Sequence, residues 1–116
     1  MQAAIILLGI TALGGVVMAW QRWRGAARPP HWLAMLHGLL AAAGLTLLLY
    51  EALTVGVPTL AQASIALFGL AALGGVWLNL RYHVNDMPLP KGIIVAHALL
   101  AVLAYVLLLL AQSGAA

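Results

Sequence analysis

Residues 32–54 of the chain read WLAMLHGLLAAAGLTLLLYEALT, an apolar run that carries one histidine and one acidic residue. A helix rises about 1.5 Å per residue, so a run of this length crosses the hydrocarbon core of a bilayer, which is about 30 Å thick. The chain contains further apolar runs of similar length over residues 3–20, 58–80 and 92–112. The sequence therefore predicts an all-α membrane protein, a bundle of four transmembrane helices.

The composition supports this prediction. Of the 116 residues, 66% are hydrophobic and 6% are charged, whereas about a quarter of the residues in a soluble domain are charged. A small soluble chain also leaves much of its surface in water and needs polar side chains to cover it. In lipid, only helices and closed barrels satisfy the hydrogen bonds of the backbone. Barrel strands alternate apolar and polar residues, whereas the apolar runs of this chain are continuous, so helices are expected. We expect one transmembrane domain over residues 1–116.

The basic residues predict the orientation. All of them lie in two of the three connectors between the apolar runs, at Arg22, Arg24, Arg28, Arg81 and Lys91. Short connectors rich in lysine and arginine stay on the cytoplasmic side. The sequence therefore predicts a multi-pass protein of the plasma (inner) membrane of a bacterium, with both basic connectors cytoplasmic and both termini outside. Because topology explains these charges, no nucleic-acid partner is expected.

The polar residues exclude several classes of function. The chain has no cysteine, which excludes disulfide frameworks, thiolate metal sites and covalently attached haem. Its only acidic residues are Glu51 and Asp86, which disfavours hydrolysis by a pair of carboxylates. No P-loop and no dinucleotide-binding glycine motif is present. The sequence predicts no catalytic side chain.

The second half of the sequence repeats the first at an offset of 60 residues. Between residues 7–52 and 67–112, 15 of 46 positions are identical without a gap. The matches include a glycine pair, a proline and a histidine, which are Gly14, Gly15, Pro30 and His37 in the first half. We interpret units 1–56 and 57–116 as two tandem helical hairpins of the same orientation. They are expected to be related by a pseudo-twofold axis along the membrane normal.

The first helix of each unit has small or short side chains four residues apart. They are Thr11, Gly15 and Ala19 in the first unit and Ala71, Gly75 and Asn79 in the second. Such spacing lets helix backbones approach closely in lipid, so close packing is the preferred interpretation. The alternative is that the glycines make room for a flat ligand.

His37 and His97 are the candidate ligands. Each follows the matched proline of its unit by seven residues, which places it about 10 Å along the helix from the cytoplasmic rim. An ionisable residue at that depth usually faces the bundle interior or a partner. A twofold axis brings the two imidazoles to the same height on facing helices. The two axial ligands of a haem iron require this arrangement. We predict that both histidines bind the iron of one haem b per chain.

Two groups of residues are expected to surround this haem. Small side chains at spacings of four and seven from the histidines leave a slot for the porphyrin, and these are Ala41, Gly44, Ala101 and Ala104. Arginines on the same side of the membrane pair with the propionates, and these are Arg22, Arg24, Arg28 and Arg81. The remaining histidines, His31 and His83, are assigned to the interface, with His83 as a propionate or proton contact. Glu51 lies near the outer rim, where protonation of a quinone is an open alternative.

The two histidines, the small residues beside them and the basic rim make the chain similar in architecture to small membrane b-type cytochromes. The resemblance implies a haem-containing electron-transfer protein or oxidoreductase subunit. Electrons would be exchanged with a quinone in the bilayer, or with a partner redox subunit or second copy of the chain. Three alternatives remain open: an accessory subunit of a larger membrane complex, a small transporter, and a metal-ion binder that uses the same histidines.

Overall fold

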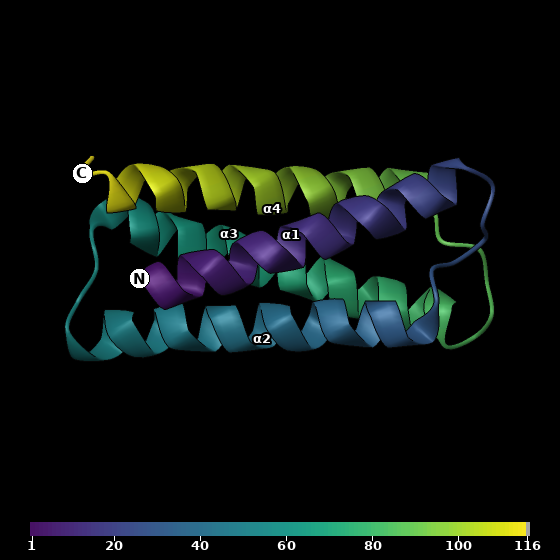
Figure 1. Ribbon diagram of the computed structural model, residues 1–116, viewed down its shortest axis with the longest axis horizontal. Helices are drawn as coiled ribbons and strands as arrows, with labels where there is room; N and C mark the ends of the chain where they lie inside the picture. The colour runs from purple at the N-terminus through teal and green to yellow at the C-terminus, as the bar shows by residue number, and fades with distance from the viewer. Residues whose placement is uncertain (116) are drawn as a thin grey trace.

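A computed structural model describes residues 1–115, and this part of the chain forms a bundle of four long helices without strands (Figure 1). The helices are α1 (Gln2–Trp23), α2 (His31–Thr54), α3 (Thr59–Trp77) and α4 (Lys91–Gln112), and α3 continues into a π-helical segment, η1 (Leu78–His83). Taking α3 and η1 together, each of the four helices is long and apolar enough to cross a membrane. The prediction of an all-α bundle of four such helices is confirmed.

Proline and glycine set the ends of the helices. Pro30, Pro58 and Pro90 each stand immediately before a helix, where the fixed φ of proline is suitable and its missing N–H is not needed. Helix α1 extends to Trp23, beyond the predicted run 3–20, because no residue interrupts it before Gly25, which adopts a φ of +112°. The third helix likewise extends past residue 80 through η1.

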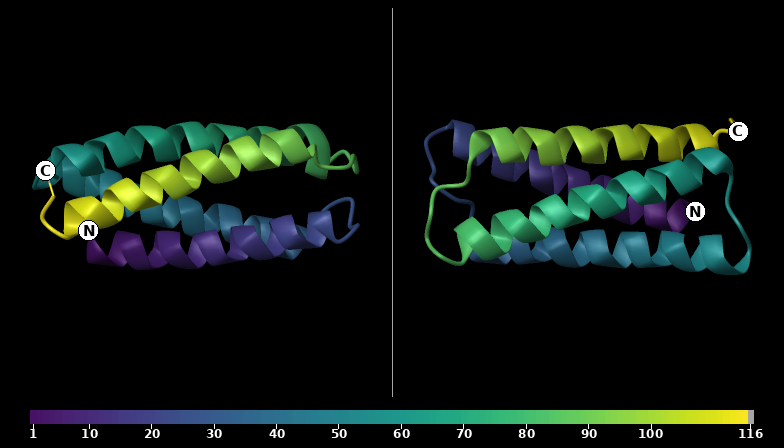
Figure 2. Two further views of the ribbon diagram at one scale, coloured as in Figure 1. Left: turned by 90° about the horizontal axis from the view of Figure 1, so that it is seen from above. Right: turned by 180° about the vertical axis from the view of Figure 1, so that it is seen from behind.

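The helices pack as two hairpins. α1 packs along α2 and α3 packs along α4, while α1 also contacts α4 and α2 contacts α3 (Figures 1 and 2). These contacts place α2 and α4 on one diagonal of the bundle. Connectors 24–30 and 84–90 lie at one end, and connector 55–58 and the two termini lie at the other. The molecule is 42 Å long, about the thickness of a bilayer with its headgroup regions.

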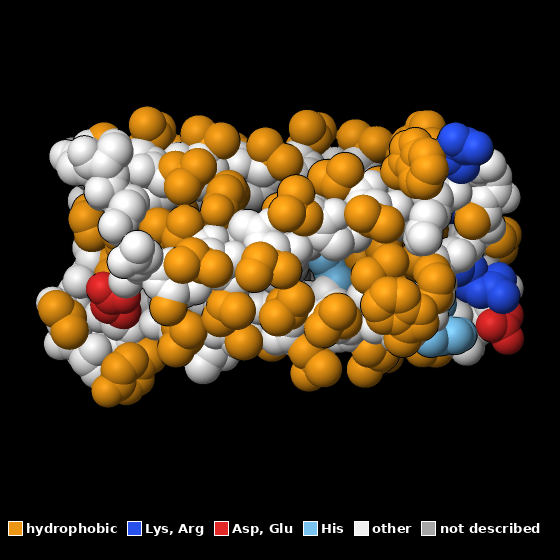
Figure 3. Space-filling model, in the orientation of Figure 1, with side chains coloured by type: hydrophobic (Ala, Val, Ile, Leu, Met, Phe, Trp, Pro, Cys, Tyr) orange, Lys and Arg blue, Asp and Glu red, His pale blue; other side chains and the backbone are white. Residues whose placement is uncertain are grey.

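The buried positions recur at the offset of 60 residues that the sequence displays. Equivalent buried pairs are Ala4 and Ser64, Thr11 and Ala71, Gly44 and Ala104, and Leu48 and Leu108. Most of these side chains are small, so the helices approach closely over the half of the bundle nearer the termini. Large apolar side chains cover the outer surface along the length of the bundle, and charged side chains lie at its two ends (Figure 3).

The two basic connectors bind each other. The Leu89 N–H donates to the Ala27 carbonyl oxygen at 3.1 Å, and the Arg22 Nε–H donates to the Leu89 carbonyl oxygen at 2.9 Å. Arg28 donates to the Asp86 carbonyl oxygen at 3.1 Å and lies 3.4 Å from the Asp86 carboxylate. These bonds join the two hairpins at the basic end.

A second set of contacts joins the hairpins toward the other end. The Tyr105 hydroxyl of α4 donates to the Ile5 carbonyl oxygen of α1 at 3.0 Å. Within the first hairpin, the amino group of Met1, which precedes α1, pairs with the Glu51 carboxylate of α2. Glu51 is therefore an ion-pair partner at the end opposite the basic connectors.

Candidate functional site

His37 is held in place by a backbone carbonyl of the neighbouring helix. Its Nδ1 lies 2.9 Å from the carbonyl oxygen of Thr11 in α1. A carbonyl only accepts hydrogen bonds, so Nδ1 carries the proton and donates it. The lone pair of the neutral imidazole is consequently on Nε2. The Thr11 hydroxyl donates to the Leu7 carbonyl oxygen at 2.8 Å and does not compete for His37.

His97 is held in the same way in the second unit. Its Nδ1 lies 2.7 Å from the carbonyl oxygen of Ala71, which occupies the position equivalent to Thr11. Nδ1 again donates and Nε2 again keeps its lone pair. Histidines that ligate metals almost always donate their other ring nitrogen to a carbonyl, carboxylate or water, which fixes the tautomer and the ring orientation. Both histidines have this arrangement.

The matched glycines make room for the two imidazoles. A Cβ atom on Gly15 would lie 3.1 Å from Cε1 of His37, and a Cβ atom on Gly75 would lie 3.1 Å from Cε1 of His97. No side chain larger than hydrogen fits there without moving the ring. The glycines that the sequence assigned to close packing thus pack against histidine side chains.

The imidazoles of His37 and His97 lie beside each other. Their ring centroids are 6.2 Å apart and their planes are inclined by 66°. Two imidazoles on opposite sides of one ion, with metal–nitrogen bonds of about 2 Å, have ring centroids about 6 Å apart, and edge-to-face pairs of rings without an ion are typically about 4.5–7 Å apart. The observed separation is compatible with both arrangements. In Figure 3 a histidine side chain is visible in a gap between the apolar side chains that cover the middle of the bundle.

The donor set favours an ion with further ligands of its own. Within residues 1–115, no group of three or more histidine, cysteine, aspartate or glutamate side chains is placed to hold a metal ion. Two imidazoles alone leave a zinc ion short of its usual three or four protein ligands. A haem iron has four ligands from the porphyrin and takes only the two axial ligands from the protein. The number of imidazole donors therefore suits a haem iron better than a free metal ion.

The predicted small residues lie in close contacts. Gly44 faces α1, where a Cβ atom would lie 2.8 Å from Cγ of Leu8. Ala104 is completely buried, and its carbonyl oxygen accepts a hydrogen bond from the Ser64 hydroxyl at 2.7 Å. Ala41 and Ala101 are half-buried. Packing between helices thus accounts for the small size of Gly44 and Ala104, and their role as a porphyrin slot stays a prediction.

The predicted arginines are divided between two environments. Arg22 and Arg28 are half-buried in the bonds that join the two connectors. Arg24 and Arg81 are exposed and lie over aromatic rings, with their guanidinium carbons 4.9 Å from the Trp20 ring and 5.7 Å from the Tyr82 ring. All four are at the basic end of the bundle, toward which His37 and His97 lie.

A second pair of histidines was not predicted. His83 is 2% exposed, and its ring stacks on His31 with centroids 4.3 Å apart and planes inclined by 25°. On a regular α-helix the residues on the face of buried Leu78 would be Arg81 and Tyr82, three and four positions later. The wider turn of η1, with the Val84 N–H bonded to the Asn79 carbonyl oxygen, brings His83 to that face. Composition and residue spacing do not predict this π-helical turn.

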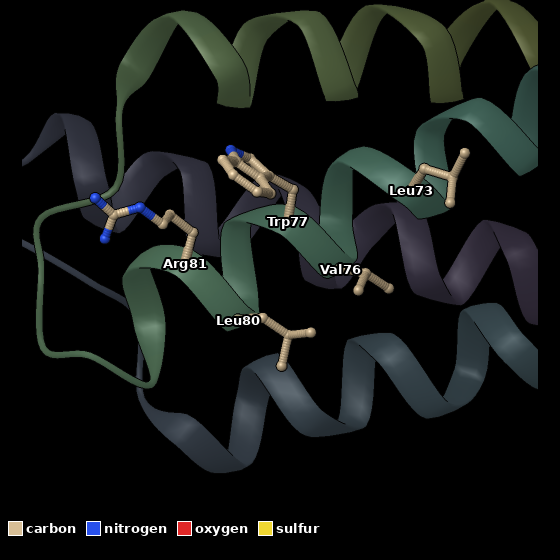
Figure 4. A pocket seen from close by; sticks show the side chains of 5 residues that line it. All are labelled: Leu73, Val76, Trp77, Leu80 and Arg81. Carbon is tan, nitrogen blue, oxygen red and sulfur yellow. The ribbon is translucent and has the colours of Figure 1, made fainter.

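The hollows of the outer surface are separate from the histidines. One lies on the outer face of α3 and η1, has a volume of about 310 Å³ and is lined by Leu73, Val76, Trp77, Leu80 and Arg81 (Figure 4). Another, of about 250 Å³, lies at the opposite end beside Tyr50 and Glu51. His37 and His97 line neither of them.

Comparison of the chain with protein-family models, with curated proteins and with solved structures found no match.

Proposed function

We propose that the chain is a membrane electron-transfer protein that binds one haem b between His37 and His97. The observation that supports this most strongly is the geometry of the two imidazoles. Each is anchored at Nδ1 by a backbone carbonyl, each keeps a free Nε2, and their centroids are 6.2 Å apart. A bound haem supplies a one-electron carrier whose potential depends on its axial ligands and its burial.

The residues around the histidines have distinct roles in this proposal. The carbonyls of Thr11 and Ala71 orient the imidazoles and increase the basicity of Nε2. Gly15 and Gly75 leave the space in which the rings stand. The neighbouring small residues would border the porphyrin, and the arginines would supply positive charge near its propionates; these are Ala41, Gly44, Ala101 and Ala104, and Arg22, Arg24, Arg28 and Arg81.

The duplicated sequence completes the proposal. Units 1–56 and 57–116 would be related by a pseudo-twofold axis along the membrane normal, which brings the histidines to one depth. The recurrence of the buried positions and of the Nδ1 hydrogen bonds supports this relation. The basic connectors would be cytoplasmic in the inner membrane of a bacterium. The haem would exchange electrons with a quinone, a partner redox subunit or a second copy of the chain.

An absorption spectrum of the purified protein tests the haem site. The chain should be produced in cells with sufficient haem and purified in mild detergent. We expect a Soret band and sharp α and β bands after reduction, and we expect His37→Ala and His97→Ala to lose them. Met35→Leu is the matched control, because Met35 is on the same helix as His37 and 56% exposed.

A folded but colourless protein would contradict the proposal. Metal analysis would then separate the metal-ion binder from the other two alternatives. Bound metal that is lost in both histidine variants would indicate a metal-ion binder, and a metal-free protein would leave the accessory subunit and the small transporter.

A further inference from the structure

His83 has an unpaired ring nitrogen inside the protein. Within residues 1–115, the buried side-chain polar atoms without a hydrogen-bond partner are His83 Nε2 and Gln21 Oε1. Burying a polar atom without a partner is unfavourable, so such an atom calls for a hydrogen-bonding partner. Gln21 Oε1 can only accept a hydrogen bond, whereas an imidazole nitrogen can also donate one.

The fold places this nitrogen by two independent features. The π-helical turn of η1 brings His83 to the inner face, and stacking on His31 holds its ring. His31 begins α2 and precedes His37 by six residues, so it lies about 9 Å nearer the basic end along the same helix. The His31–His83 pair therefore stands between the His37–His97 pair and the basic end of the bundle.

A carboxylate is the ligand that suits this position. The propionates of a haem are ionised, and charge is unfavourable in the apolar part of the membrane, so they point toward a polar end. Arg22 and Arg28 already bond to Leu89 and Asp86 in the other connector. His83 Nε2 is buried and has no partner, while the ring also hydrogen-bonds the backbone of Pro29, whose only polar backbone group is a carbonyl. With the other ring nitrogen donating to that carbonyl, Nε2 donates to a carboxylate from the protonated ring, a form that an ionised carboxylate favours.

We propose that His83 donates a hydrogen bond from Nε2 to a propionate carboxylate of the haem, and that His31 positions the His83 ring by stacking. This inference rests on the proposed haem site. The charged or titratable groups that act on His83 are His31 from α2, Arg28 from the first connector and Asp86 from the second. Arg28 would add positive charge near the carboxylate, while Asp86 is already paired with Arg28.

Haem and its dimethyl ester, in which both propionates are neutral esters, provide the test. The full-length chain is prepared without haem in detergent and titrated with each compound, and the absorption change gives the two affinities. The unaltered chain should bind haem about tenfold more tightly than the ester, as expected for a charge-assisted hydrogen bond. Equal affinities would overturn the proposal without the use of any variant.

Variants then assign the effect to His83. His83→Phe keeps a ring to stack on His31 and removes the donor, so it should lose about tenfold in affinity for haem and nothing for the ester. His83→Gln restores an N–H donor and should recover most of the affinity for haem. Lys91→Gln is the control, because it removes a positive charge from the same end, where Lys91 lies over the Trp23 ring 5.4 Å from its centroid.

The outcomes separate this inference from the proposed function. If the unaltered chain binds neither compound, the proposed haem site is wrong and this inference with it. If both compounds bind and His83→Phe weakens them equally, the haem site stands and the propionate contact is wrong. Loss of haem affinity in Lys91→Gln equal to that in His83→Phe would indicate an effect of overall charge, which would also overturn the contact.

Discussion

At the scale of single residues, the two imidazoles and the two glycines beside them form interdependent pairs. Gly15 and Gly75 leave room for rings that are also tied to backbone carbonyls through Nδ1. A ring held by a hydrogen bond moves away from a new methyl group only by lengthening that bond. The glycine and the histidine of each unit are therefore constrained together, which explains why the repeat keeps both.

Substituting these glycines tests the constraint. Gly15→Ala and Gly75→Ala should each destabilise the protein by about 1–3 kcal/mol, the usual effect of overpacking, because Cβ would lie 3.1 Å from the imidazole. Gly69→Ala is the matched control in α3, where a Cβ atom meets nothing within 4 Å, and it should be neutral or stabilising by up to about 1 kcal/mol. Thermal unfolding in detergent measures the difference. Equal stabilities for Gly75→Ala and Gly69→Ala would show that the ring moves freely.

The proximity of His37 and His97 could be predicted from the sequence, and the features that could not be predicted have a physical reason. His37 and His97 stand out because a histidine inside an apolar run is rare and the repeat pairs them. Which backbone carbonyls accept their hydrogen bonds cannot be predicted from the sequence, because every residue has a carbonyl group. His83 was assigned to the interface because it lies at the rim and has no equivalent in the repeat, and the π-helical turn of η1, which brings it to the inner face, is not predicted by residue spacing.

At the scale of the helices, close approach depends on small residues that meet specific partners. α1 and α4 are joined where the Tyr105 hydroxyl donates to the Ile5 carbonyl oxygen beside Gly9. A Cβ atom on Gly9 would lie 2.7 Å from the Tyr105 hydroxyl oxygen and 3.4 Å from the ring carbon that carries it. Gly9 thus permits the only side-chain hydrogen bond from α4 to α1 within residues 1–115.

A double-mutant cycle tests this contact between α1 and α4. Gly9→Ala should destabilise the chain by about 1–3 kcal/mol because the new methyl group displaces the hydroxyl. Tyr105→Phe should cost about 0.5–1 kcal/mol, a typical value for a hydrogen bond between membrane helices. In the Tyr105→Phe background the oxygen is gone, so Gly9→Ala should cost much less than it does alone. Additive losses in thermal unfolding would show that the two residues do not meet.

At the scale of the whole molecule, the bundle differs between its two ends. One end holds the basic connectors, which bind each other, and the stacked pair His31 and His83. The other holds Glu51, which pairs with the amino group of Met1. The order of the helices and their approximate lengths followed from apolar runs and prolines. The bond between Leu89 and Ala27 could not be predicted, because backbone groups of two irregular segments form it.

The difference between the ends leads to a prediction about orientation. If basic connectors stay in the cytoplasm, connector 24–30 is inside and connector 55–58 is outside. The chain has no cysteine, so a single introduced cysteine is the only thiol to label. Ala26→Cys and Val55→Cys place it at exposed positions in the two connectors, and Val55 is 84% exposed. With a membrane-impermeant thiol reagent on intact cells, Val55→Cys should react, and Ala26→Cys should react only after the membrane is made permeable. Labelling of Ala26→Cys on intact cells would show that the orientation is opposite to the predicted one, with the proposed haem nearer the outer surface.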